Sequence, residues 1–138
     1  MKGRTVAKAI PARSIARDSR NHRRFALLAA KEAEQVLGLF ERERPKDHRP
    51  RRAIEGIKAW AEGSRVLGMA EVRKLSLGSH AAAREARSEA ARFAARAAGQ
   101  AVATWHVPTH AMGASMYACK ALLASLNAPS KKRRRQAE

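Results

Sequence analysis

The sequence predicts an all-α protein, a compact, alanine-rich bundle of about five helices with basic, disordered termini. Apolar residues recur every three or four positions along several segments, which is the period of an amphipathic helix. No segment alternates apolar and polar residues as a half-buried strand does. Hydrophobic residues make up 45% of the chain but aromatic residues only 4%, so alanine and aliphatic side chains must fill the core. The length of 138 residues suits one domain.

The first predicted helix begins near Asn21, whose side chain can cap its free N–H groups, and ends before Pro45. Seven residues at helical spacing form its apolar face: Phe25, Leu28, Ala29, Ala33, Val36, Leu37 and Phe40. The residue before a proline is pushed out of the helical region, and a second proline follows at Pro50. Residues 45–50 are therefore predicted to form a tight, polar connection.

The second predicted helix is short. Asp47 is placed to cap it, Pro50 suits its first turn and Gly63 its C-terminal stop. Its apolar face consists of Ala53, Ile54, Ile57, Trp60 and Ala61. Because Trp60 lies on this face, we expect its ring, like that of Trp105, to be in the core.

A long alanine-rich stretch, residues 68–107, follows a polar turn around Ser64. We expect it to form two helices with a break at residues 87–88, because Ser88 can cap the second one. The small side chains of Ala90, Ala94 and Ala98 form a ridge that lets two helix backbones approach closely. The predicted result is a tightly packed bundle with no deep cleft.

The last predicted helix starts after Pro108, with Thr109 as its cap, and carries the clearest amphipathic pattern of the chain. Seven residues recur at spacings of three and four, and all but Ser115 are apolar: Met112, Ser115, Met116, Cys119, Leu122, Leu123 and Leu126. We expect this face to pack against the core, which would make Cys119 a buried structural thiol. A single cysteine allows no internal disulfide and favours a reducing, cytoplasmic compartment.

The net charge of +17 is concentrated at the two ends of the chain. Residues 1–24 carry eight Lys or Arg and one acid, and residues 128–138 carry five and one. We therefore divide the chain into a basic segment 1–21, a helical domain 22–127 and a basic tail 128–138. The tail contains a run that could bind a polyanion without reading its sequence: Lys131, Lys132, Arg133, Arg134 and Arg135.

The residues that could carry chemistry do not form a known catalytic pattern. The sequence has neither a glycine-rich phosphate loop nor a nucleophile elbow, and its acids are interspersed with arginines at salt-bridge spacing. A three-histidine metal site at His80, His106 and His110 is the one alternative, but Pro108 interrupts the helix that would aim two of these rings at one ion. We expect no enzyme activity, no cofactor and no bound metal.

Six polar residues in the second half of the chain are predicted to form a network inside or along the bundle, namely His80, Arg84, Arg96, His106, His110 and Tyr117. Arg84 and Arg96 stand among alanines, so a buried guanidinium would need acceptors such as Glu85, Glu89 or helix-end carbonyls. The alternative is that both arginine side chains reach out to water along their apolar stems. The sequence leaves both possibilities open.

Residues 25–124 resemble a bacterial family of putative immunity proteins, which belong to the gene neighbourhoods of polymorphic toxins. The resemblance rests on ordered short motifs: Phe40-Glu41 before Pro45, Arg49-Pro50-Arg51, Ala53-Ile54-Glu55, Trp60-Ala61, Gly63, His80-Ala81-Ala82-Ala83-Arg84-Glu85-Ala86, Ala95-Arg96-Ala97-Ala98-Gly99, His106-Val107, His110-Ala111, Gly113-Ala114 and Tyr117-Ala118. The basic ends lie outside this region and are expected to be particular to this chain.

The resemblance implies a non-enzymatic, cytoplasmic, helical protein that binds and neutralises a cognate toxin, and it implies no active-site residues. Immunity proteins that block nucleases often present acidic surfaces that imitate phosphate, whereas this chain is basic. A nuclease toxin bound by such mimicry is therefore not expected. The alternative function is a basic accessory protein that binds nucleic acid, with no membrane partner in either case.

Overall fold

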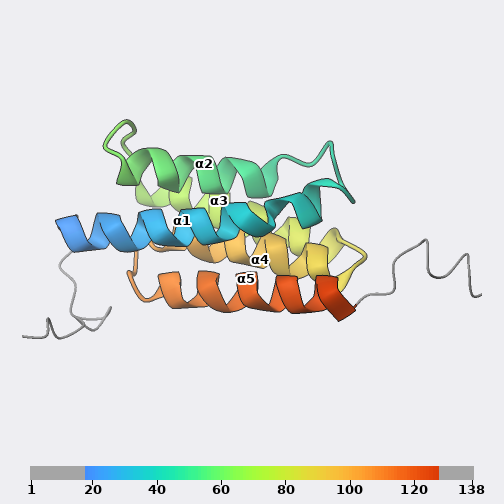
Figure 1. Cartoon of the computed structure of the whole chain (residues 1–138). Coiled ribbons are helices and arrows are strands. Elements are labelled where there is room, and N and C mark those ends of the chain that lie inside the picture. The colour runs from blue at the N-terminus through green and yellow to red at the C-terminus, as the bar shows by residue number, and fades with distance from the viewer. Residues whose placement is uncertain (1–17, 128–138) are drawn as a thin grey trace, which may run out of the picture.

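The computed structural model describes residues 18–127, and this part of the chain is an all-α bundle (Figure 1). Its helices are α1 (Arg20–Glu41), α2 (Arg49–Ala61), α3 (Met69–Glu85), α4 (Glu89–Ala103) and α5 (His110–Asn127). Residues 18–127 contain no strand. The prediction of an alanine-rich bundle of about five helices is confirmed, while the predictions for residues 1–17 and for the basic tail lie outside the described residues.

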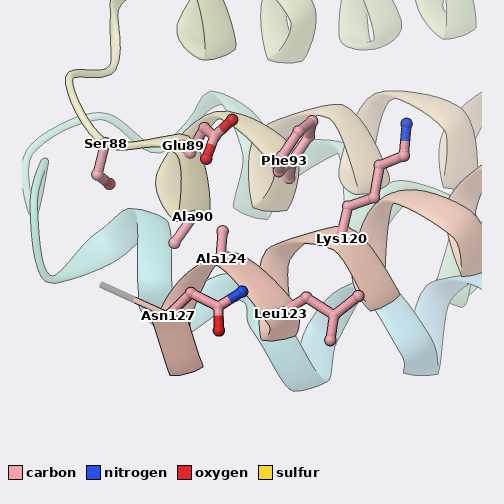
Figure 2. A pocket seen from close by; sticks show the side chains of 8 residues that line it. All are labelled: Ser88, Glu89, Ala90, Phe93, Lys120, Leu123, Ala124 and Asn127. Carbon is pink, nitrogen blue, oxygen red and sulfur yellow. The ribbon is translucent and has the colours of Figure 1, made fainter. Parts of the chain in front are cut away.

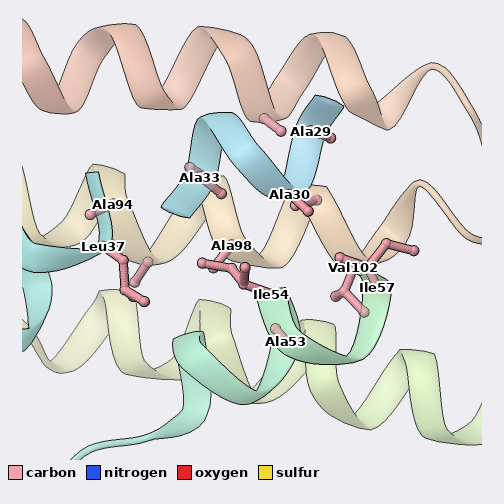
Figure 3. Packing of buried hydrophobic residues seen from close by; sticks show 14 of the residues in the cluster. Ala29, Ala30, Ala33, Leu37, Ala53, Ile54, Ile57, Ala94, Ala98 and Val102 are labelled. Atoms are coloured by element: carbon pink, nitrogen blue, oxygen red, sulfur yellow. The ribbon is translucent and has the colours of Figure 1, made fainter. Parts of the chain in front are cut away.

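Helix α4 is the centre of the bundle and contacts each of the other four helices. Its sequence explains this position, since eight of its residues are buried and seven of these are alanine or glycine: Ala91, Ala94, Ala95, Ala97, Ala98, Gly99, Ala101 and Val102. Small side chains allow the neighbouring backbones to come close on every side. Figure 3 shows Ala94 and Ala98 of α4 in one cluster with larger aliphatic side chains of α1 and α2, Leu37, Ile54 and Ile57.

Local signals in the sequence set most helix boundaries. Ser88 accepts a hydrogen bond from the N–H of Ala91 and so caps α4, as predicted. Gly63 has a φ of +82°, a left-handed conformation that suits glycine and stops the chain after α2. Trp60 and Trp105 are both buried, as expected.

Two caps differ from the prediction by one or two residues. Ser19, not Asn21, caps α1, because its backbone is extended and its hydroxyl accepts a hydrogen bond from the N–H of His22. His48 occupies the cap position of α2, and Asp47 instead accepts a hydrogen bond from the N–H of Arg49 at 3.2 Å. Short polar residues cluster before both helices, so composition alone does not select the capping one.

The two helix connections at one end of the bundle are joined by polar contacts. The Glu43 carboxylate accepts hydrogen bonds from the N–H groups of Arg87 and Ser88, both at 2.8 Å. Although burial raises the pKa of Glu43, these N–H groups hold it below its ordinary value. Arg49 bonds Asp47 at 2.7 Å and also contacts Glu85, so the α1–α2 connection is anchored to the end of α3.

The prediction that the apolar stripe of the last helix packs inward is wrong. Helix α5 buries Ala111, Ala114, Ala118 and Ala121 instead, and Cys119 is exposed. The alanines also recur at spacings of three and four, and only their small side chains let the backbone of α5 approach α4 closely. Leu28, placed on the apolar face of α1 by the prediction, is likewise 53% exposed.

Within residues 18–127, no helix is both long enough and apolar enough to cross a membrane.

Candidate interaction surfaces

The outward side of α5 is the main cluster of exposed large apolar side chains in the described chain. We call it the α5 face and define it by Met112, Met116, Cys119, Leu122, Leu123 and Leu126. Its methionines and leucines are between 48% and 78% exposed. A soluble helix normally turns such side chains inward, so a contiguous apolar patch of this kind marks an interaction surface.

A groove of about 440 Å³ runs between the start of α4 and the end of α5, beside this face (Figure 2). Phe93 and Leu123 form apolar parts of its wall and Lys120 a charged one. The Phe93 ring stacks on Tyr117 with centroids 6.1 Å apart, and the Lys120 ammonium lies 5.6 Å from both rings. The aromatic pair therefore holds the one Lys or Arg of α5 by cation–π contact.

His80 and Arg96 are brought together between α3 and α4. An N–H of the Arg96 guanidinium lies 2.9 Å from His80 Nδ1, which must accept because arginine only donates. Burial, the nearby Arg96 and then Arg84 lower the pKa of His80 to about 4, so the ring is neutral at pH 7. Gly99 makes room for it, since a Cβ there would lie 2.6 Å from His80 Nε2.

Of the other predicted network residues, Arg84 and His110 lie near enough to His80 to help lower its pKa, and His106 lies near His110. His110 Nδ1 is 2.7 Å from Gln100 Oε1, and burial followed by the proximity of His106 lowers the pKa of His110. Arg84 and His106 are exposed, so the Arg84 side chain follows the solvent-facing alternative. Tyr117 belongs to the aromatic pair with Phe93. Among residues 18–127, no three His, Cys, Asp or Glu side chains are grouped so that they could hold a metal ion.

The most enclosed histidine, His22, has no counterpart in the sequence predictions. It is completely buried; its Nδ1 accepts from the N–H of Asp18 at 2.9 Å and its Nε2 lies 2.6 Å from the Thr104 carbonyl. Its ring also meets Trp60 edge-on at 5.0 Å. These contacts tie the start of α1 to the end of α4, which is a structural role. The surrounding Arg-rich sequence gives no signal for it.

A second groove, of about 430 Å³, lies between α2 and α3 and is basic. We call it the α2–α3 groove; its lining residues are Arg49, Arg52, Glu71, Lys74, Leu75 and Gly78. Arg49 and Glu71 are already paired with other charged groups. Arg52 and Lys74 are exposed and make no ion pair with any described residue. Their charges are therefore available to an acidic partner.

These features define a class: a small helical protein whose tight alanine core supports one apolar and one basic surface. The family model described as Imm-5 like putative immunity protein matches residues 16–138. The chain therefore belongs to this family. Because the match includes the C-terminal basic run, the expectation that this run lies outside the family region is wrong. Comparison with curated proteins and with solved structures gives no match.

Proposed function

We propose that this chain is a non-enzymatic, cytoplasmic immunity protein that neutralises a cognate bacterial toxin by binding it directly. The family match over residues 16–138 is the observation that carries this proposal. The α5 face and the α2–α3 groove also support the proposal, because a rigid helical scaffold with exposed side chains suits recognition of another protein. The catalytic steps of the toxin would be blocked by occlusion, with no reaction performed by the immunity protein.

The basic α2–α3 groove indicates the kind of toxin surface that the chain would meet. Arg52 and Lys74 have no acidic partner of their own in the described chain, and the net charge is +17. A toxin with an acidic surface would therefore be attracted over a distance and bound faster at low salt. A toxin whose binding site is itself basic, as in many nucleases, would be repelled.

The test is co-expression with each toxin encoded beside this chain's gene. We expect survival of cells that make one such toxin, co-purification of the two proteins, and protection that titrates at one immunity protein per toxin. Phe40→Asp, which puts a charge into a fully buried position, serves as the unfolded control and should abolish protection. Lack of protection against every neighbouring toxin would contradict the proposal, and protection at substoichiometric amounts would contradict its non-enzymatic part.

A charge-reversal pair tests the role of the groove. Arg52→Glu with Lys74→Glu should slow association with the toxin at least about tenfold at low salt, because electrostatic steering contributes that much or more to association rates. Arg24→Glu with Lys31→Glu is the matched control, since these exposed residues lie on α1 and the change in net charge is the same. An equal slowing by both pairs would show that only net charge matters.

Nucleic-acid binding is the second candidate function, and the exposed Arg52 and Lys74 favour it together with the basic tail. It predicts an affinity for DNA or RNA that falls steeply as salt rises, because bound counterions are released. It also predicts loss of binding when residues 128–138 are deleted. If the shortened chain binds DNA and RNA as well as the full chain does, the tail has no part in binding.

A further inference from the structure

We infer that the α5 face is a homodimer interface, on which a second copy of this chain packs its own α5 in antiparallel orientation. Helix α5 lies along one edge of the bundle (Figure 1). It buries its alanines, and its neighbours are α1 and α4. Its opposite side carries the exposed methionines and leucines, with Lys120 and Ser115 beside them; the Ser115 hydroxyl donates a hydrogen bond to the Glu32 carboxylate of α1. The inference is independent of the proposed toxin binding.

The spacing of the face selects a second copy as the occupant. Met112, Cys119 and Leu126 follow one another at intervals of seven and form one line along the helix, with Cys119 at its midpoint. A twofold axis beside Cys119 places Met112 of one copy opposite Leu126 of the other. It also places Met116 of one copy at the level of Leu122 and Leu123 of the other. An isologous interface requires this self-complementarity, and an arbitrary partner does not.

The charges of α5 also favour a second copy over an acidic or polyanionic partner. Lys120 is the one Lys or Arg of the helix, and it lies over the Phe93 and Tyr117 rings at the side of the face. A partner recognised by its negative charge would be expected to meet arginines or lysines, as in the α2–α3 groove. Two α5 faces instead associate mainly by burial of apolar area, since the Lys120 ammonium already lies against the aromatic pair and the Glu32 carboxylate already accepts from Ser115.

The size of the face sets the expected strength of the dimer. Helix α5 has 18 residues and is about 27 Å long. A standard interface buries about 800 Å² on each partner, and one pair of helices of this length buries less. The two copies also repel each other, because each carries a net charge of +17. We therefore expect dissociation in the micromolar range and a dimer that becomes stronger as salt screens the repulsion.

Sedimentation equilibrium of the full chain under reducing conditions tests the inference. We expect a reversible monomer–dimer equilibrium whose dissociation constant falls with added salt. Leu123→Glu and Met116→Glu should each raise the dissociation constant at least about tenfold, because each places one carboxylate per copy, two in all, in the dimer interface near the twofold axis. Leu77→Glu is the matched control, since Leu77 is a 62% exposed leucine on α3, and it should leave the equilibrium unchanged. All three sites are exposed, so circular dichroism should show an intact helical fold.

Cys119 provides a direct probe of the axis. A short bis-maleimide that spans the about 8–10 Å between packed helix axes should link two copies through their Cys119 thiols. The matched control, Cys119→Ser with Leu77→Cys, moves the thiol to α3 and should give little linked dimer. A chain that stays monomeric at high micromolar concentration, or equal cross-linking of both proteins, would overturn the inference. The α5 face would then be open to a different protein or to the chain's own ends.

Discussion

Helices α1 and α5 carry the same kind of sequence pattern but use it in opposite ways. In α1 the large residues in the second half of the apolar stripe, Val36, Leu37 and Phe40, are buried. In α5 the large residues are exposed and the alanines are buried. The difference shows that a helical stripe identifies residues that share a face, while the neighbouring helix decides which face it accepts. Here the neighbours of α5 are α4 and α1, and most of the residues that α4 buries are alanines.

The largest expected effect comes from truncating one residue of each stripe. Phe40→Ala in α1 should lower the free energy of unfolding by about 3–5 kcal/mol, because it leaves a cavity at a fully buried site. Leu123→Ala in α5 should change it by no more than about 0.5 kcal/mol in the monomer, because the side chain is 57% exposed. Urea unfolding at low protein concentration measures both. Similar losses in the two variants would remove the distinction between the helices.

The alanine side of α5 should respond to enlargement. Ala114→Leu at a fully buried contact should cost about 1–3 kcal/mol of unfolding free energy, because the added side chain forces α5 away from the core. Met116→Leu, on the exposed side of the same helix, is the control and should be nearly neutral. Chemical denaturation again gives the two values, and a neutral Ala114→Leu would mean that α5 packs loosely.

A third prediction concerns the contact between α3 and α4. Gly99→Ala should lower the free energy of unfolding by about 1 kcal/mol. The new Cβ displaces the His80 ring, and this cost is larger than the gain of about 1 kcal/mol in helix propensity. In a His80→Ala background the ring is gone, so Gly99→Ala should raise the free energy of unfolding through its helix propensity alone. The sign change between the two backgrounds, measured by thermal or urea unfolding, is the diagnostic result.

A fourth prediction is a pH dependence that belongs to the core side of α3. The pKa of His80 is lowered from 6.5 to about 4, so the unfolded chain takes up a proton at a higher pH than the folded chain. Stability should therefore fall as pH drops from 6.5 toward 4. His80→Gln should reduce this decline and leave the part due to His110, whose pKa is also lowered, while the exposed His48→Gln should leave it in place. Loss of stability from Glu43 and Asp47, whose pKa values are also lowered, should follow at lower pH.

Much of the fold could be predicted because its causes are local. The break between α3 and α4 follows from Ser88, and the end of α2 follows from Gly63. The orientation of α5 could not be predicted, because Ala111 and its partners form a stripe as regular as that of the leucines and methionines. Hydrophobicity ranks leucine above alanine and so favours the wrong face.

The candidate site was predictable only in its parts. His80 and Arg96 stand out among alanines, but their pairing depends on the packing of α3 on α4 and on the space left at Gly99. His110 pairs with Gln100, a residue without a signal of its own in the sequence. Long-range contacts of this kind depend on the helix arrangement, which periodicity within single helices does not determine.

The reactivity of Cys119 tests most directly the claim that α5 buries its alanines and exposes its larger side chains. The measurement is the rate of reaction with the thiol reagent DTNB in native buffer, at protein concentrations low enough to keep the chain monomeric. The account predicts one fast-reacting thiol per chain, at a rate close to that of the urea-unfolded protein, because Cys119 is exposed. A thiol that reacts only after the protein is unfolded would contradict it.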